Sequence, residues 1–249
     1  MSTNRFFLSA PDIKGDRVRL SPEQSHQVQH VLRLRPGDAI VVLDDTGIEY
    51  DVTLTVVDKR ETVGQVTNRQ QARGEPTAQV TLFQSMLMRD KFEWVLQKGT
   101  EIGIARFTPV VTARSLVRFK EVDEKKLDRW RRIVTEAAEQ SHRGRIPKID
   151  QILKFDDALS SLVEFDRSLI AAPSHEGPTL RETLQGMAGE AVSVAVMVGP
   201  EGGFTDEEVE AARRGGAIPV SLGPRILRTE TCAIVAPALV LHELGEMGP

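Results

Sequence analysis

The feature that most constrains this chain is the alternation of apolar, strand-like runs with helical runs from Val80 to the C-terminal end. Strand-like runs occupy 80–87, 107–111, 168–172, 192–198 and 218–222. Helical spacing or capping signals mark 92–102, 125–141, a helix that begins after Thr205, and 231–244. Such alternation is typical of a parallel sheet with helices packed on it. We therefore expect an α/β domain in this part of the chain.

The first third of the chain has a different pattern. Short β-like runs at 18–20, 39–43, 49–54 and 64–66 are separated by turn residues, which predicts a small β-barrel. One helix is expected over 22–34, with Ser21 as its N-cap and Val28, Val31 and Leu32 on its buried side. Because residues 68–77 are almost free of apolar side chains, we place the boundary there and expect domains 1–72 and 73–249.

Composition narrows the class of protein. Hydrophobic residues make up 40% and charged residues 27% of the chain, and no apolar run approaches the ~20 residues of a membrane-spanning helix. The apolar stretch near the start is too short for a signal peptide. Since Cys232 is the single cysteine, an internal disulfide is excluded, and a cytoplasmic protein is expected.

Charge is unevenly distributed along the sequence. The net charge is −4, yet residues 89–148 hold 15 Lys and Arg against 9 Asp and Glu. A basic face can attract a polyanion although the whole protein is acidic, because surface potentials are local. From charge alone, a solvated helix face explains this segment equally well.

A glycine-rich run, Val198 to Phe204, directly follows one strand and precedes the helix with the Thr205 capping signal. In an open parallel sheet, ligands bind at the carboxyl ends of strands. Glycines at this place let a ligand approach the backbone closely. The alternative is an ordinary strand-to-helix turn, and the run lacks the spacing of a phosphate-binding loop or a dinucleotide fingerprint.

A second run, Leu222 to Thr231, also follows a strand and opens a helix. It offers Arg225 and Arg228 as cations and Glu230 as a carboxylate, beside an apolar pair able to cover a flat ring. Two such loops at two strand ends can wall one pocket. Two simpler explanations stay open: Thr229 as an N-cap, and Glu230 as a first-turn partner of the helix dipole.

Other polar clusters give weaker signals. Lys98 and Glu101 fit a surface pair as well as a site, whereas Arg143 and Arg145 are placed on a loop that suits phosphate contacts. The five histidines are scattered, so no metal site is expected. Cys232 lies in an apolar helix and is expected to be a small core residue, not a nucleophile.

Taken together, five motifs resemble the ribosomal RNA small subunit methyltransferase E family, and the match runs nearly end to end. The motifs are Arg5-Phe6-Phe7, Lys98-Gly99-Thr100-Glu101, Glu139-Gln140-Ser141, Gly199-Pro200-Glu201-Gly202-Gly203-Phe204 and the run from Leu222 to Thr231. This sequence departs from the family pattern at Cys232, where the family usually has alanine, and both residues are small.

This resemblance implies a SPOUT-type parallel sheet with a C-terminal trefoil knot, preceded by a PUA-like β-barrel that helps to grip RNA. It also implies a homodimer that binds S-adenosyl-L-methionine and methylates N3 of one uridine in 16S ribosomal RNA near the decoding centre. As substrate, the resemblance favours the assembled small subunit over free ribosomal RNA.

The chemistry implies roles for particular residues. A base must reach uridine N3–H, and cations or amides should stabilise charge on the uracil oxygens. We expect Glu230 or Glu201 as proton acceptor or orienting group, with Arg228 or Arg5 as electrostatic partner. Cofactor contacts are expected from Val198, Gly199, Pro200, Glu201, Gly202, Gly203, Ser221, Leu222, Gly223, Ile226, Leu227 and Arg228. RNA contacts are expected from Arg5, Arg33, Arg35, Lys98, Arg143 and Arg145.

Three alternatives compete with this interpretation. A non-catalytic RNA-binding or assembly factor would need no glycine-walled pocket. A nucleotide-hydrolysing enzyme would need a phosphate-loop lysine and a metal-binding carboxylate at matched positions, which this sequence lacks. Methyl transfer to a different RNA is the third, and the choice of uridine rests on the family resemblance.

Overall fold

The computed structural model describes all residues except 1–3, 59–60, 89, 117–121, 173–176 and 249. It divides into two compact units, one of Met1–Glu75 with Ala138–Ile146, the other of Pro76–Ala137 with Pro147–Pro249. Each unit is therefore built from separate stretches of sequence, whereas the expected domains 1–72 and 73–249 are continuous. The two units are described in turn.

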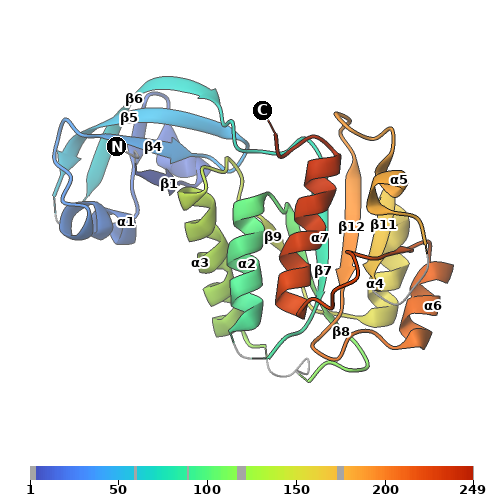
Figure 1. Ribbon diagram of the computed structural model, residues 1–249. Helices are drawn as coiled ribbons and strands as arrows, with labels where there is room; N and C mark the ends of the chain where they lie inside the picture. Colours follow the sequence, from blue (N-terminus) through green and yellow to red (C-terminus); the bar gives the residue numbers. More distant parts are fainter. Residues whose placement is uncertain (1–3, 59–60, 89, 117–121, 173–176, 249) are drawn as a thin grey trace. The chain divides into compact units, whose positions relative to one another are not determined.

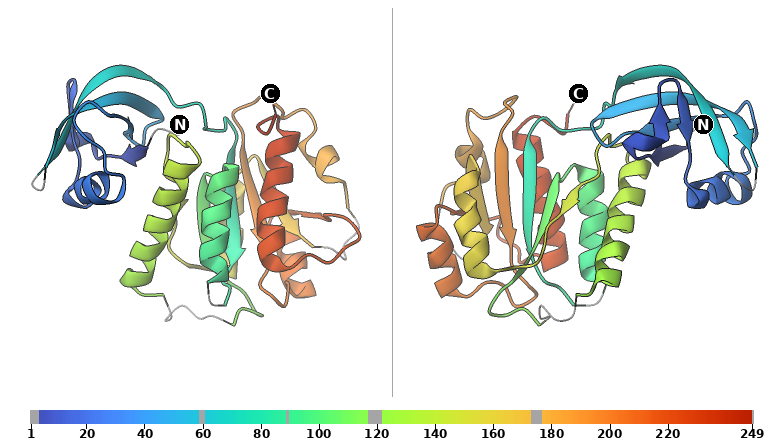
Figure 2. Two further views of the ribbon diagram at one scale, coloured as in Figure 1. Left: turned by 60° about the vertical axis from the view of Figure 1, so that its left-hand side comes forward. Right: turned by 180° about the vertical axis from the view of Figure 1, so that it is seen from behind.

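A six-stranded sheet forms the first unit, in the order β1-β4-β5-β6-β3-β2. Figure 2 shows the sheet curling on itself with its long strands β5 and β6 strongly bent. Among the strands described in this unit, β1 and β4 form the one parallel pair. The strands are β1 Arg5–Phe7, β2 Ile13–Lys14, β3 Arg17–Arg19, β4 Ala39–Leu43, β5 Ile48–Val57 and β6 Thr62–Gln71. Among the described residues β1 and β2 do not pair, so the expected barrel is a curled, open sheet.

The polar stretch from residue 68 is part of this sheet. Strand β6 continues to Gln71, and Asn68 to Gln71 pair with Ile48 to Asp51. Residues 68–71 are therefore part of a strand, because an exposed hairpin needs backbone pairing but not apolar side chains. The first stretch of this unit ends at Glu75, within the boundary region 68–77 expected from the sequence.

The expected helix at 22–34 is shorter than predicted. Helix α1 spans Pro22–His26, and Ser21 caps it with the full capping box to Gln24. A π-helical turn, Gln27–Val31, follows and is closed by the bond from the Leu32 amide to the Gln27 carbonyl. Val28 is buried as predicted, but Val31 is 67% exposed, because the wider turn rotates it away from the core.

Residues 138–146 are attached to the first unit by packing and by hydrogen bonds. Ala138 packs with Phe7 and Leu43, and the Phe7 amide donates to Glu139. The loop that follows is held by Glu75, which accepts two hydrogen bonds from the guanidinium of Arg143.

The second unit is a seven-stranded parallel sheet (Figure 1). Its order is β10-β8-β7-β12-β11-β13, with β9 also pairing with β8. The strands are β7 Gln79–Ser85, β8 Arg106–Val111, β9 Lys148–Ile149, β10 Leu153–Lys154, β11 Arg167–Ala171, β12 Ser193–Val198 and β13 Ile218–Val220. The α/β prediction is confirmed.

Helices cover both faces of this sheet (Figure 2). The helices are α2 Lys91–Ile102, α3 Glu124–Gln140, α4 Phe155–Ser161, α5 Leu180–Leu184, α6 Asp206–Arg214 and α7 Thr229–Glu243. One face packs Phe83 and Met197 of the sheet against Phe155 of α4 and Val209 of α6. On the other face lie α2, α3 and α7, where Phe92 stacks on the buried Trp130. No helix in the described part of the chain has the length and apolar character to cross a membrane.

Candidate functional site

A cavity of about 450 Å³ lies at the carboxyl edge of the parallel sheet. Its walls come from the segments that follow β11, β12 and β13, which are neighbours in the sheet order β12-β11-β13. Because all three strands run in the same direction, their following loops emerge at one edge, where α/β sheets bind ligands. The two glycine-rich runs of the sequence therefore wall one pocket, as expected.

The loop after β12 is compact and anchored. A Cβ on Gly199 would lie 3.0 Å from the Phe204 amide nitrogen, so the loop folds onto itself where a side chain would not fit. Gly203 has a φ of +67°, a left-handed conformation that other residues adopt at a cost. From the segment after β8, Arg114 donates to the carbonyls of Gly202 and Phe204 at 2.8 and 3.1 Å. Both the shape and the position of this loop are thus fixed.

The loop after β13 supplies the opposite wall. Gly223 has a φ of +104°, and Ser221 accepts a hydrogen bond from its amide at 3.3 Å, which forms a local turn. Beyond the turn, Ile226 is 91% exposed, an unusual environment for a large aliphatic side chain. Exposure beside a cavity suits a residue that is covered when a ligand binds.

The structure brings together nearly all of the expected cofactor contacts. Ser221 does not line the cavity, since its hydroxyl serves the turn at Gly223. The other residues predicted to touch the cofactor do line it: Val198, Gly199, Pro200, Glu201, Gly202, Gly203, Leu222, Gly223, Ile226, Leu227 and Arg228.

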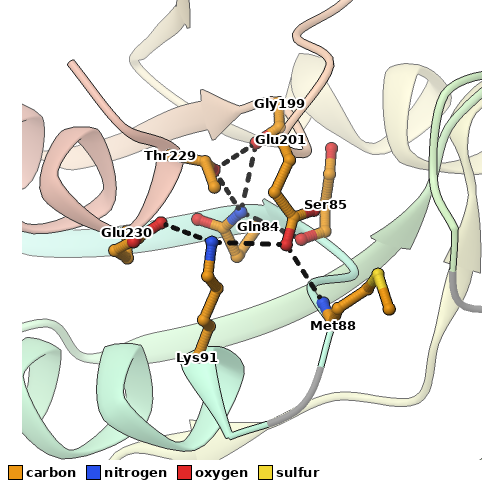
Figure 3. Close-up of polar contacts among 8 residues, drawn as sticks. All are labelled: Gln84, Ser85, Met88, Lys91, Gly199, Glu201, Thr229 and Glu230. Carbon is orange, nitrogen blue, oxygen red and sulfur yellow. Dashed lines mark hydrogen bonds and ion pairs between the residues drawn. The ribbon is translucent and has the colours of Figure 1, made fainter.

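A buried polar cluster joins this edge of the sheet to α7 (Figure 3). At the end of β7, the Gln84 side-chain amide lies 3.4 Å from both the Gly199 carbonyl and the Thr229 hydroxyl, and Thr229 donates to Gly199. Thr229 is the first residue of α7 and not its N-cap, because that position belongs to Arg228, which makes no side-chain capping bond. The N-cap explanation of Thr229 is therefore wrong.

Both predicted carboxylates contact one lysine that the sequence did not single out (Figure 3). Lys91 Nζ lies 3.3 Å from Glu230 and 3.6 Å from Glu201. Glu201 also accepts a hydrogen bond of 3.3 Å from the Met88 amide. Glu201 lines the cavity, whereas Glu230 is not among the lining residues and its carboxylate contacts Lys91. Lys91 opens α2 far away in sequence, so no local signal connected it with these glutamates.

The environment of Glu230 favours its charged form. Burial raises the pKa of Glu230, but the backbone amide at the helix start, the Lys91 ammonium and the charge of Arg228 together lower the pKa below its ordinary value. Glu230 is therefore an anion at neutral pH and a weak proton acceptor.

Comparisons with known proteins agree with this geometry. Residues 73–241 match the protein family described as RNA methyltransferase domain, and residues 20–66 match the RNA methyltransferase PUA domain. The ribosomal RNA small subunit methyltransferase E of Bacillus subtilis is 32% identical over 228 residues, which cover 90% of this chain and 89% of that protein. The chain belongs to the ribosomal RNA small subunit methyltransferase E family.

Other members support the assignment. The methyltransferase E of a Synechocystis strain is 34% identical over 98% of this chain and 77% of its own length. A crystal structure of methyltransferase E from Neisseria gonorrhoeae bound to S-adenosyl methionine has a TM-score of 0.85 at 31% identity, covering 97% of this chain and 98% of that one. The SPOUT-type parallel sheet expected from the motifs is thus present, and the expected PUA-like β-barrel is present as a curled, open sheet.

Two of the six expected RNA contacts in this methyltransferase E family member are engaged inside the protein. Arg143 is 3% exposed and held by Glu75, so its guanidinium cannot reach a phosphate without breaking that pair. Arg5 is paired with Glu49, with only 9% of its side chain exposed. The burial and pairing of these side chains disfavour Arg143 as an RNA contact. They also disfavour Arg5 as an RNA contact and as the electrostatic partner of a catalytic carboxylate.

The remaining expected RNA contacts are accessible. Arg33, Arg35 and Arg145 are exposed, while Lys98 is partly exposed and pairs with Glu101 at 2.7 Å on the same helix. These four residues stay candidates.

Cys232 lines the cavity and is only partly buried, so the expectation of a simple core residue was incomplete. Burial raises the pKa of its thiol to about 11. Because a neutral thiol is a poor nucleophile, Cys232 supplies an apolar wall. In the described part of the chain, no three His, Cys, Asp or Glu side chains are grouped so as to hold a metal ion.

Proposed function

We propose that this chain transfers a methyl group from S-adenosylmethionine to N3 of a uridine in 16S ribosomal RNA, near the decoding centre, to give 3-methyluridine. One observation carries the proposal: in a chain of this family, the two glycine-rich loops wall a single cavity at the carboxyl edge of the parallel sheet. The relative from Neisseria gonorrhoeae was crystallised with S-adenosyl methionine, which supports the cofactor.

The cavity fits such a cofactor in size and chemistry. Its volume of about 450 Å³ lies in the range of small-molecule pockets. Leu222 and Leu227 offer apolar surface to an adenine ring. The carboxylate of Asp206 suits the cationic groups of the cofactor, and Arg225 suits its carboxylate, because opposite charges attract. When bound, S-adenosylmethionine supplies a methyl group already activated on its sulfonium.

The chain must then prepare the base. Uridine N3–H accepts a methyl group only after losing its proton, so a proton acceptor and a stabilised uracil anion are needed. Because Glu201 is among the residues that line the cavity and Glu230 is not, we propose Glu201 as the proton acceptor and Glu230 as an orienting group. Arg228, also on the cavity wall, is the cation available to the uracil oxygens.

The enzyme is also proposed to act in the cytoplasm as a homodimer on the assembled small subunit. Its apolar surface supports self-association: Trp94 on α2 is 44% exposed and Leu239 on α7 is 38% exposed. Light scattering should give twice the 27.6 kDa of one chain.

The deciding test is transfer of radiolabelled methyl from S-adenosylmethionine to small ribosomal subunits that lack the modification, followed by nucleoside analysis. Label in 3-methyluridine is expected. Folded protein that binds the cofactor but labels neither subunits nor free ribosomal RNA would point to another RNA substrate. Arg228→Ala should lose turnover, and calorimetry shows whether cofactor binding is lost with it.

A further inference from the structure

Lys91 occupies a position that the helix alone would not favour. It is the first residue of α2, where the helix dipole favours anions and disfavours cations. Its ammonium reaches Glu230 at 3.3 Å and Glu201 at 3.6 Å. The contacts with two carboxylates, one of which belongs to a residue of the cavity wall, therefore explain the presence of a lysine at this position better than helix formation does.

The two glutamates belong to segments that must be held together for the cavity to exist. Glu201 lies in the loop after β12, and Glu230 lies in the first turn of α7, directly after the loop that follows β13. Figure 3 shows Lys91 between them, with the side chains of Glu201 and Glu230 converging on its nitrogen from either side. Lys91 thus bridges the two walls of the cavity.

A second connection runs beneath this bridge between the same two segments. Gln84 lies 3.4 Å from the Gly199 carbonyl and from the Thr229 hydroxyl, and Thr229 donates to Gly199. This inner connection is buried, whereas the Lys91 side chain is 37% exposed. Because the inner hydrogen bonds already hold the backbone of the two segments, the ionic bridge fixes the side chains at the rim of the cavity.

We propose that Lys91 is a positioning residue that couples the loop 199–204 to the start of α7 and fixes the Glu201 side chain at the cavity rim. One ammonium shared by two carboxylates screens their mutual repulsion, which would otherwise push the loop away from α7. The identity of the ligand rests on the proposed function, but the coupling itself does not.

The experiment compares K91M, E230Q and the double variant K91M/E230Q with the wild type. Lys154→Met is the matched control, because this exposed lysine of β10 lies outside the cavity walls. Amide hydrogen exchange of residues 199–204 in the cofactor-free protein is the first readout. The Kd for S-adenosylmethionine by calorimetry and the separate kcat and KM values are the second.

K91M should accelerate exchange in residues 199–204 and weaken cofactor binding by at least about fivefold, a typical size for coupling between two sites. E230Q should have a smaller effect, and the double variant should be milder than K91M, because neutralising Glu230 removes the repulsion that K91M leaves unscreened. K91R should retain most of the wild-type behaviour, and K154M all of it.

The proposal is overturned if exchange and cofactor affinity in K91M stay within twofold of the wild type, or if the effects of K91M and E230Q simply add. Should K91M not fold, E230Q and K91R decide in the same way: unchanged loop exchange in E230Q overturns the bridge. A wild-type protein that neither binds the cofactor nor methylates RNA refutes the proposed function, while the exchange experiment still tests the bridge.

Discussion

Replacing Arg143 with methionine should destabilise the protein markedly although the residue lies far from the cavity in sequence. The Arg143 side chain is 3% exposed, and its Nε and Nη2 each donate to Glu75 at 3.0 Å. Glu75 is itself 16% exposed and also accepts from the amides of Gly144 and Arg145 at 2.9 and 3.1 Å. Methionine keeps much of the side-chain volume but leaves the carboxylate without its cation.

The expected loss in the free energy of unfolding follows from the burial of this ion pair. Removing one partner of a buried ion pair costs about 3–5 kcal/mol, because the other charge stays desolvated. The two amides that still bind Glu75 favour the lower end, about 3 kcal/mol. For a chain of this size, about 2–4 °C is lost per kcal/mol, so the melting temperature should fall by roughly 6–12 °C.

Thermal unfolding followed by circular dichroism measures this shift, with Arg145→Met as the matched control. Arg145 is exposed and donates from its guanidinium to the Thr46 carbonyl at 2.9 Å, so its replacement should cost less than about 1 kcal/mol. The double variant R143M/E75Q should recover much of the loss, because it removes both charges and keeps an oxygen that accepts from the Gly144 and Arg145 amides. A melting temperature of R143M within 1 °C of the wild type would refute the reasoning.

Three further predictions concern single positions. Gly64→Ala should lower the free energy of unfolding, measured with a chemical denaturant, by about 1–3 kcal/mol, because a Cβ there would lie 2.2 Å from the Val52 side chain. An unchanged free energy of unfolding would contradict this close packing. Alkylation of Cys232, the single cysteine, should accelerate about tenfold per pH unit up to pH 10, because its pKa is about 11, and a plateau near pH 9 would disprove the shift. Because the pKa of Glu230 is lowered in the folded protein, its ionised form stabilises the fold above the ordinary carboxylate pKa, and this contribution is lost as pH falls through the folded value. The stability difference between wild type and Glu230→Gln should therefore shrink on acidification, and a difference independent of pH would count against it.

Much of the architecture could be derived from local sequence. The strands from β7 to β13 that were predicted coincide closely with apolar runs. The Ser21 N-cap and the Thr205 capping box are present as expected, because such signals depend on residues only a few positions apart. The short strands β9 and β10 and the helices α4 and α5 were missed, since two to seven residues carry too little periodicity.

The candidate site was predictable to the extent that it is made of consecutive residues. Glycine runs that follow strands identify the two loops, and the parallel direction of the strands brings the loops to one edge. Family resemblance then supplied the chemistry that spacing alone could not.

Only the tertiary structure decided which residues that lie far apart in the chain form ion pairs. The sequence by itself determined the alternating α/β pattern, the two glycine-rich loops and the basic middle segment, because periodicity, turn chemistry and charge are local properties. It did not determine that Arg143 is neutralised by Glu75, or that Lys91 lies between Glu201 and Glu230. In the sequence, an arginine or lysine that faces water cannot be told apart from one that pairs with a carboxylate, because only folding brings the carboxylate close to it.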